Sequence, residues 1–133
     1  MPDYTLTNLE AVEDSAPKFG MAPALEAHFA NKALDVERSG ISFQRLQPGS
    51  RIPFGHRHKE QEEVYVVVEG GGRIALDGEA VDLRRLDAVR IPPGTMRCLE
   101  AGPEGIGVVM FGAPARGPDD VEMEQGWWGP DEA

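Results

Sequence analysis

Short runs of β-type residues, separated by glycine and proline, occupy the chain from Gly40 onward. Residues 41–47 (ISFQRLQ) alternate apolar and polar positions, which is typical of a half-buried strand. Residues 64–68 (VYVVV) are continuously β-branched or aromatic, as in a strand that is buried on both faces or lines a closed barrel. Further runs at about ten-residue spacing complete a pattern that predicts an all-β sandwich or barrel: RIAL (73–76), AVDL (80–83), DAVRI (87–91) and IGVVMF (106–111).

Turn-forming residues stand between these runs. Asp77-Gly78 separates RIAL from AVDL, and this dipeptide is among the strongest two-residue hairpin signals. Pro92-Pro93-Gly94 ends another run, and the totals of 16 glycines and 11 prolines fit many turns between short strands. A length of 133 residues suits one domain. We expect an N-terminal arm over residues 1–39, a barrel over 40–116 and an acidic tail over 117–133.

One segment before the barrel has helical character. Residues 22–34 (APALEAHFANKAL) are rich in alanine and leucine, and Pro23 stands where the first turn of a helix tolerates proline. Leu25, Phe29 and Ala33 recur every four residues, which predicts a short helix with one apolar face packed on the barrel. His28 lies next to that face and is interpreted as a surface or packing residue rather than a ligand.

The acidic residues are concentrated at the two ends of the chain. The formal net charge is −10, while residues 18–116 contain 13 acids and 13 bases. No basic patch is available for a phosphate backbone or an anionic lipid surface, so neither nucleic acid nor membrane is expected as a partner. No apolar run is long enough to span a bilayer, and a soluble, cytoplasmic protein is expected. In the tail, one or both of Trp127 and Trp128 are expected to dock on the domain or on a neighbouring subunit.

The residues with the clearest chemistry are His56 and His58. On a strand, residues i and i+2 point to the same face about 6.6 Å apart, so two imidazoles can converge on one ion. Glu62 and Glu63 stand just before VYVVV and offer a carboxylate from the next strand. Two histidines and one carboxylate with open positions suit iron(II), and the set also accepts Mn, Ni, Co, Cu or Zn.

Residues 49–70 (GSRIPFGHRHKEQEEVYVVVEG) resemble the first motif of the cupin superfamily, in which His-x-His is followed by Glu and then Gly. Glu63 lies five residues after His58 and seven before Gly70, so it matches both intervals of the motif. Glu62 fits the shorter His-to-Glu interval only, and a shift of one residue would turn the carboxylate to the opposite face of the strand. The resemblance therefore implies that His56, His58 and Glu63 are the metal ligands.

Residues 86–101 (LDAVRIPPGTMRCLEA) resemble the second cupin motif less closely. Pro92 and Gly94 match, but Arg97 occupies the position of the family's third metal-binding histidine. The resemblance implies a small antiparallel barrel of the jelly-roll (double-stranded β-helix) type, usually a homodimer. It also implies metal-dependent chemistry on a small organic molecule, of a kind shared by dioxygenases, isomerases and decarboxylases, without distinguishing among them.

Arg97 leaves two interpretations open. A guanidinium is always charged and has no lone pair to give, so Arg97 cannot be a ligand. In the first interpretation the remaining three ligands hold the ion, and Arg97 binds an anionic substrate from outside the ligand set. In the second, Arg97 pairs with Glu63 or Glu62 and replaces the cation, and the barrel is a metal-free module that binds a small ligand without turnover. Tyr65 shares a face with Glu63 and is expected either to line the pocket or to pack in the core, and Cys98 is expected to be a buried, inert thiol.

Overall fold

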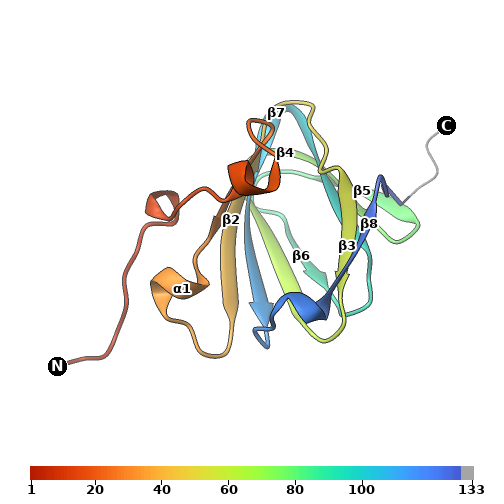
Figure 1. Cartoon of the computed structure of the whole chain (residues 1–133). Coiled ribbons are helices and arrows are strands. Elements are labelled where there is room, and N and C mark those ends of the chain that lie inside the picture. Colours follow the sequence, from red (N-terminus) through yellow and green to blue (C-terminus); the bar gives the residue numbers. More distant parts are fainter. Residues whose placement is uncertain (130–133) are drawn as a thin grey trace.

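The computed structural model describes residues 1–129 and shows antiparallel strands curled into a small barrel (Figure 1). The prediction of an all-β antiparallel barrel is confirmed, and in place of one short N-terminal helix the structure has 3-10 turns and the four-residue α1. The elements in chain order are η1 (Leu9–Ala11), η2 (Ala16–Phe19), β1 (Leu25–Phe29), α1 (Asn31–Leu34), β2 (Gly40–Leu46), β3 (Phe54–His58), β4 (Glu62–Leu76), β5 (Glu79–Leu83), β6 (Ala88–Ile91), β7 (Arg97–Ala113), η3 (Pro118–Asp120) and β8 (Val121–Gln125).

Two long strands, β4 and β7, pair with each other over almost their whole lengths and connect the rest of the sheet. The first half of β4 also pairs with β6, and its second half with β5. The second half of β7 pairs with β2, whereas its first residue, Arg97, lies opposite His56 of β3. Each long strand therefore contributes to two walls of the barrel, and side chains from both walls face one interior.

The bend between the two halves of β4 coincides with shifts in its pairing register, between Val67 and Glu69 and between Gly70 and Gly72. Gly70 has a φ of +59°, and a Cβ at this position would lie 2.0 Å from the carbonyl oxygen of Gly105. No other residue type fits so close to the backbone of β7, so glycine here allows the strand to change walls.

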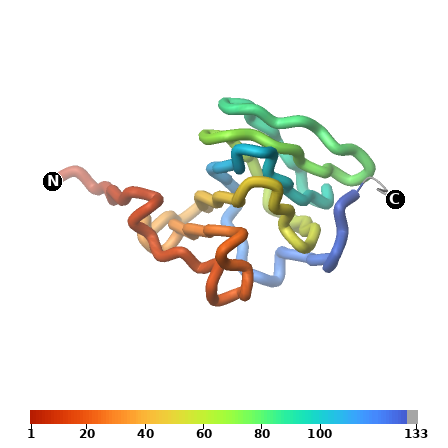
Figure 2. Tube along the Cα trace, turned by 90° about the horizontal axis from the view of Figure 1, so that it is seen from above, coloured from red at the N-terminus to blue at the C-terminus, as the bar shows by residue number. Residues whose placement is uncertain are grey.

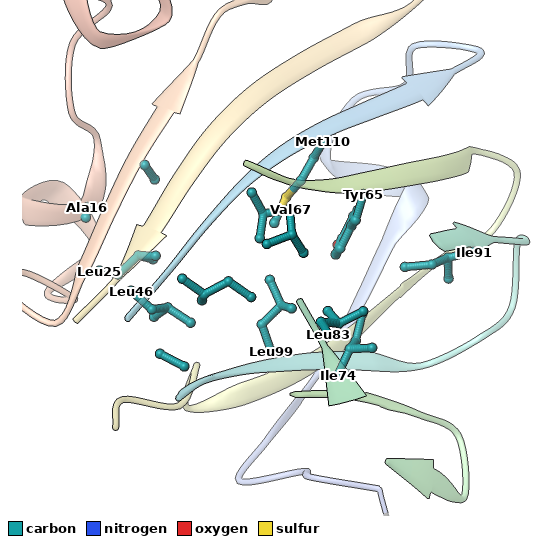
Figure 3. Close-up of a cluster of buried hydrophobic side chains, with 14 residues drawn as sticks. Ala16, Leu25, Leu46, Tyr65, Val67, Ile74, Leu83, Ile91, Leu99 and Met110 are labelled. Atoms are coloured by element: carbon teal, nitrogen blue, oxygen red, sulfur yellow. The ribbon is translucent and has the colours of Figure 1, made fainter. Parts of the chain in front are cut away.

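Alternate residues of β4 point inward and build the core (Figure 3). Tyr65 and Val67 are 1% exposed, and they pack with Ile74, Leu99 and Met110 from the rest of β4 and from β7. Each apolar side chain that is fully buried in this way stabilises the fold by about 1.5–3 kcal/mol. The predicted strands at 41–47, 64–68, 73–76, 80–83, 87–91 and 106–111 all coincide with observed strands, except that residues 47 and 87 lie just outside β2 and β6. Asp77-Gly78 forms the turn between β4 and β5.

The prediction of a helix over residues 22–34 is wrong for most of this segment. Residues 25–29 form strand β1, which pairs with β2 at the edge of the sheet, and only Asn31–Leu34 are helical. The apolar residues Leu25 and Ala27, two apart, are both buried, whereas Phe29 is 51% exposed. An unpaired edge of β2 offers a full ladder of hydrogen bonds to this segment, and that pairing outweighs the helix propensity of its alanines.

The N-terminal arm runs across the outside of β1 and is fixed by His28. This residue is buried, its Nδ1 lies 2.6 Å from the carbonyl oxygen of Val12, and its Nε2 lies 2.7 Å from Glu26 Oε1. Asp14 forms an isolated bridge opposite His28 and accepts hydrogen bonds from the backbone of Ala16 and Ala27. His28 is therefore a packing residue that holds the arm, in agreement with its interpretation from the sequence.

The C-terminal segment docks on the other side of the barrel from the arm (Figure 2). Strand β8 pairs with β3 along its length, from Phe54 opposite Gln125 to His58 opposite Val121. Trp128 is 6% exposed and packs on Ala75 and Cys98, which confirms the expectation that a tryptophan of this pair docks on the domain. Within residues 1–129, no helix has the length and apolar character needed to cross a membrane.

Candidate metal centre

His56, His58 and Glu63 come together inside the barrel. The two histidines are on β3 and the glutamate is the second residue of β4, and one ligand atom from each lies within 4.8 Å of the others. Glu63 Oε1 is 3.1 Å from His58 Nε2 and 3.8 Å from His56 Nε2. Nitrogen and oxygen ligands that share an ion at about 2.0–2.2 Å stand roughly 3.0–3.5 Å apart, so these residues fit a metal ion with little movement.

The neighbouring glutamate points away from this centre. The Glu62 side chain is 54% exposed and lies 3.5 Å from Arg90 Nη1 on the surface. The Glu63 side chain is only 13% exposed. Alternation along β4 explains the difference, because adjacent residues of a strand face opposite sides. The geometry therefore selects Glu63 over Glu62 as the carboxylate of the cluster.

His58 is held on its far side by Asp120, the last residue of η3. Asp120 is 6% exposed, and its Oδ2 lies 3.0 Å from His58 Nδ1. An ionised carboxylate can only accept hydrogen bonds, so this contact keeps a proton on Nδ1 and turns Nε2 toward Glu63. Histidines that bind metals commonly have such a carboxylate partner behind them.

Asp120 was missed by the sequence analysis, which treated residues 117–133 as an acidic tail. A signal was present just after it, because Val121 and Met123 alternate with Glu122 and Glu124 in the manner of a strand. The sequence alone could not show that this strand pairs with β3, more than 60 residues earlier.

Arg97 lies beside the cluster on the inner side. Its side chain is 1% exposed, and Nη1 is 3.4 Å from Glu63 Oε1, a charge contact rather than a well-aligned hydrogen bond. The nitrogens Nε, Nη1 and Nη2 are shielded from solvent and have no hydrogen-bond acceptor among the described residues. Arg97 thus pairs with Glu63 and not with Glu62, and its charge is buried next to the candidate ligands.

Tyr65 packs in the core and also contacts the cluster. The ring is in the core, and the hydroxyl lies 3.5 Å from Glu63 Oε1. Burial raises the pKa of Tyr65 far above its usual value, and the charge of Glu63 adds to this effect. The hydroxyl therefore keeps its proton and can donate it toward the carboxylate.

The protonation of the cluster follows from its packing. Burial opposes ionisation of Glu63, but contacts with His56, His58 and Arg97 outweigh burial and lower its pKa to about 2. Burial lowers the pKa of His56. Burial also acts against charge on His58, yet contacts with Glu63 and Asp120 raise its pKa above the usual value. At neutral pH Glu63 is an anion and His56 has a free lone pair, which are the states that metal ligands require.

Cys98 takes no part in the cluster. It is 2% exposed, its Sγ donates to the carbonyl oxygen of Ile52 over 3.1 Å, and burial raises its pKa to about 11. A thiol in this state is not a nucleophile at neutral pH, as the sequence analysis expected.

Comparisons with known proteins agree with the fold. The profile of the cupin domain family matches residues 42–105. A cupin protein from Bacteroides fragilis is 26% identical with a TM-score of 0.70, over 86% of this chain and 87% of that one. The nucleoside dehydratase Pac13 from Streptomyces is 18% identical with a TM-score of 0.71, over 94% of this chain and 92% of that one. The salicylate 1,2-dioxygenase of Pseudaminobacter salicylatoxidans is 19% identical with a TM-score of 0.66, over 84% of this chain and 34% of that one.

A curated relative matches a shorter stretch. An uncharacterised protein of Methanocaldococcus jannaschii is 38% identical over 45 residues, which make up 34% of this chain and 36% of the relative. The matched stretch is thus about a third of the length of that protein. Since the family profile covers the His-x-His and Pro-Pro-Gly motifs and the barrel superimposes on a solved cupin, the chain belongs to the cupin superfamily.

Proposed function

We propose that the protein binds a divalent transition metal through His56, His58 and Glu63 and takes up a small organic anion at that centre. The observation that carries this proposal is the meeting of three ligand atoms within 4.8 Å, from two strands of the barrel. A solvated polar face would not bury a carboxylate between two imidazoles, because each buried charge costs free energy unless it is paired. Among the ions that such a set accepts are Fe, Mn, Ni, Co, Cu and Zn.

The charge of the site supports an anionic ligand. With a divalent cation held by Glu63, and with Arg97 close by at 3.4 Å, the positive charges outweigh those of Glu63 and Asp120. A positive site within low-dielectric walls attracts anions, and a carboxylate or enolate is the organic group that matches it. Arg97 lies outside the ligand set and orients Glu63 from the inner side.

A bound ion would polarise a carbonyl or enolate oxygen of the ligand as a Lewis acid. The residues of the chain supply the rest of the site. His56 is the most exposed of the three candidate ligands, with a side chain 24% exposed, so the ligand enters past this residue. Tyr65 keeps its proton and donates toward Glu63. Oxidoreductase or isomerase activity is consistent with this arrangement, and relatives of the same fold include a dioxygenase and a dehydratase.

A second candidate function rests on the contact between Arg97 and Glu63. If this ion pair is the resting state of the site, Arg97 takes the place of the cation and the barrel binds a small ligand without metal or turnover. The two functions differ in one measurable property, the metal content of the native protein.

The test is metal analysis by mass spectrometry on protein purified without a histidine tag or chelator. We expect about one metal ion per chain, lost in His56→Ala and retained in Arg57→Ala. Arg57 lies between the two histidines on the opposite face of β3, so it is the matched control. A folded native protein that contains no metal, and takes up none when Co²⁺ or Zn²⁺ is added, would overturn the proposal in favour of the metal-free module.

The class of ligand is tested on the cobalt-loaded protein. Benzoate should change the visible spectrum of the bound Co²⁺, whereas the uncharged benzamide, of nearly the same shape, should not. An equal response to the two compounds would contradict the preference for an anion.

The homodimer expected from the cupin resemblance is retained as a proposal. It is supported by Phe111 of β7, which is 44% exposed and lies opposite Ile41 of β2 on the outer face of the sheet. A large exposed aromatic side chain on such a face is typical of a surface that a second copy covers. Sedimentation equilibrium of the native chain and of Phe111→Ser decides between monomer and dimer.

A further inference from the structure

We propose that Asp120 is a positioning residue of the metal centre, so that the C-terminal segment is part of the site. This inference rests on the proposed function. It concerns the segment of residues 117–128, called here the C-terminal strap, which contains η3 and β8 and follows the barrel in sequence.

The carboxylate of Asp120 is fixed in place by the turn between β3 and β4. Oδ1 accepts a hydrogen bond from the backbone of Glu60 at 2.8 Å, and Oδ2 accepts one from Gln61 at 3.3 Å. The backbone oxygen of Asp120 accepts another from Lys59 at 2.8 Å. These three residues are among the four that separate His58 from Glu63 in sequence, so Asp120 holds the turn that connects two of the candidate ligands.

The contact of Asp120 with His58 determines which ring nitrogen is available. Because Oδ2 accepts from Nδ1, a proton stays on Nδ1, and Nε2, which lies 3.1 Å from Glu63 Oε1, is the nitrogen that binds an ion once it has given up its own proton. An imidazole that could rotate or exchange tautomers would present the correct nitrogen only part of the time. Loss of such a carboxylate typically costs about 10- to 100-fold in metal affinity.

The strap is anchored separately at its other end. Trp128 packs on Ala75 and Cys98, and the Arg51 guanidinium carbon lies 3.9 Å from the centre of the Trp128 ring. Strand β8 adds its own ladder to β3. A change of the Asp120 side chain alone should therefore leave the strap docked, and its effect on the metal can be measured on a folded protein.

The experiment compares Asp120→Asn with Asp119→Asn by titration with Co²⁺. Both variants remove one acidic charge from η3, but Asp119 is exposed. In Asp120→Asn, Oδ1 can still accept from Glu60, while the new amide donates to His58 Nδ1 and drives the proton to Nε2. We expect the affinity for Co²⁺ to fall by about 10- to 100-fold in Asp120→Asn and to stay within about twofold in Asp119→Asn.

A second readout reports position rather than stability. In the zinc-loaded native protein, ¹⁵N NMR of the histidine rings should show His58 protonated at Nδ1 and bound through Nε2. In Asp120→Asn that signature should be lost, and Asp120→Glu, which restores a carboxylate, should recover part of the affinity.

The outcomes separate this inference from the proposed function. A native protein that binds no metal refutes the function itself. A native protein that binds Co²⁺ with the same affinity as Asp120→Asn refutes the role of Asp120 and leaves the function intact. If Asp120→Asn does not fold, the NMR signature of the native protein still decides, because a His58 that is bound through Nδ1 contradicts the inference.

Discussion

Arg97 Nη1 lies 3.4 Å from Glu63 Oε1, at the sequence position where the cupin pattern has a metal-binding histidine. The guanidinium is buried, and Glu63 is its ion-pair partner in the described part of the chain. A cation thus stands where the cupin pattern has a lone pair. Its charge balances that of the carboxylate and at the same time opposes a second cation nearby.

The first prediction concerns this residue. Arg97→His removes a positive charge beside the site and adds a lone pair, so the affinity for Zn²⁺ should rise by about tenfold or more. Isothermal titration calorimetry with Zn²⁺ measures the change. Arg97→Lys keeps the charge and adds no ligand, and its affinity should stay near that of the native chain. Equal affinities in the two variants would contradict the view that the charge of Arg97 limits metal binding.

The second prediction separates Glu63 from Glu62. Glu63→Gln leaves the buried charge of Arg97 without its partner, and such a loss costs about 3–5 kcal/mol in free energy of unfolding. Glu62→Gln removes only a contact between exposed side chains, which stabilises by less than about 1 kcal/mol. Urea denaturation of the metal-free proteins measures both values. The assignment of Glu63 would have to be withdrawn if the two variants unfolded at the same urea concentration.

The parts of this structure that could be predicted from the sequence are those set by local pattern. Alternation gave β2, and the apolar run of residues 64–68 gave the first half of β4, because a strand buried on both sides needs β-branched and aromatic residues throughout. The meeting of His56, His58 and Glu63 followed from two spacings and the resemblance to the cupin motif. The hydrophobic pattern of a strand and the spacing of the His-x-His…Glu motif can each be read from a segment of about 15 residues.

The parts that could not be predicted depend on contacts between distant residues. Residues 25–29 satisfy both a helical and a strand pattern, and only the free edge of β2 decides between them. The residues next to Asp120 in sequence do not distinguish it from an exposed aspartate. Its burial depends on contacts with the turn at residues 59–61. The packed barrel was also needed to show that the Arg97 nitrogens have no hydrogen-bond acceptor within residues 1–129.

The third prediction is a pH dependence that originates in His28. Both ring nitrogens face acceptors, the carbonyl oxygen of Val12 and the carboxylate of Glu26, so the folded protein favours the doubly protonated ring. Burial alone would lower the pKa of His28, but the contacts with Glu26, Val12 and Asp14 outweigh it and raise the pKa above the usual value. Arg45 of β2 is the nearby positive charge, because it pairs with the Glu26 carboxylate that contacts His28.

A raised pKa of a histidine in the folded state means stability that is complete below about pH 6.5 and is lost as the pH rises through the folded value. The free energy of unfolding of the native chain, minus that of His28→Gln, should therefore fall between pH 6.5 and pH 9. Urea midpoints at several pH values give this difference. His58 also has a raised pKa, but it is present in both proteins and cancels. A difference that is constant over this range would show that His28 does not carry the charge.

The fourth prediction uses Gly55, which lies on β3 directly before His56. A Cβ at this position would stand 2.4 Å from Trp127 Cε3 and 3.1 Å from Met96, so Gly55→Ala must displace the Trp127 ring that covers it. Trp127 and Trp128 are the two tryptophans of the chain, and the intrinsic fluorescence therefore reports on the strap alone. We expect emission at longer wavelength in Gly55→Ala, with a loss of about 1–3 kcal/mol in free energy of unfolding.

Gly117→Ala is the matched control, because a Cβ at Gly117 meets nothing within 4 Å and this residue also belongs to the strap. Its emission and stability should equal those of the native chain. If Asp120 positions His58 as proposed, displacement of the strap by Gly55→Ala should also weaken the binding of Co²⁺, and bound Co²⁺ should in turn favour the docked strap, since linkage between two equilibria is reciprocal. A Gly55→Ala protein with shifted emission and unchanged affinity for Co²⁺ would show that the outer part of the strap and the metal centre are independent.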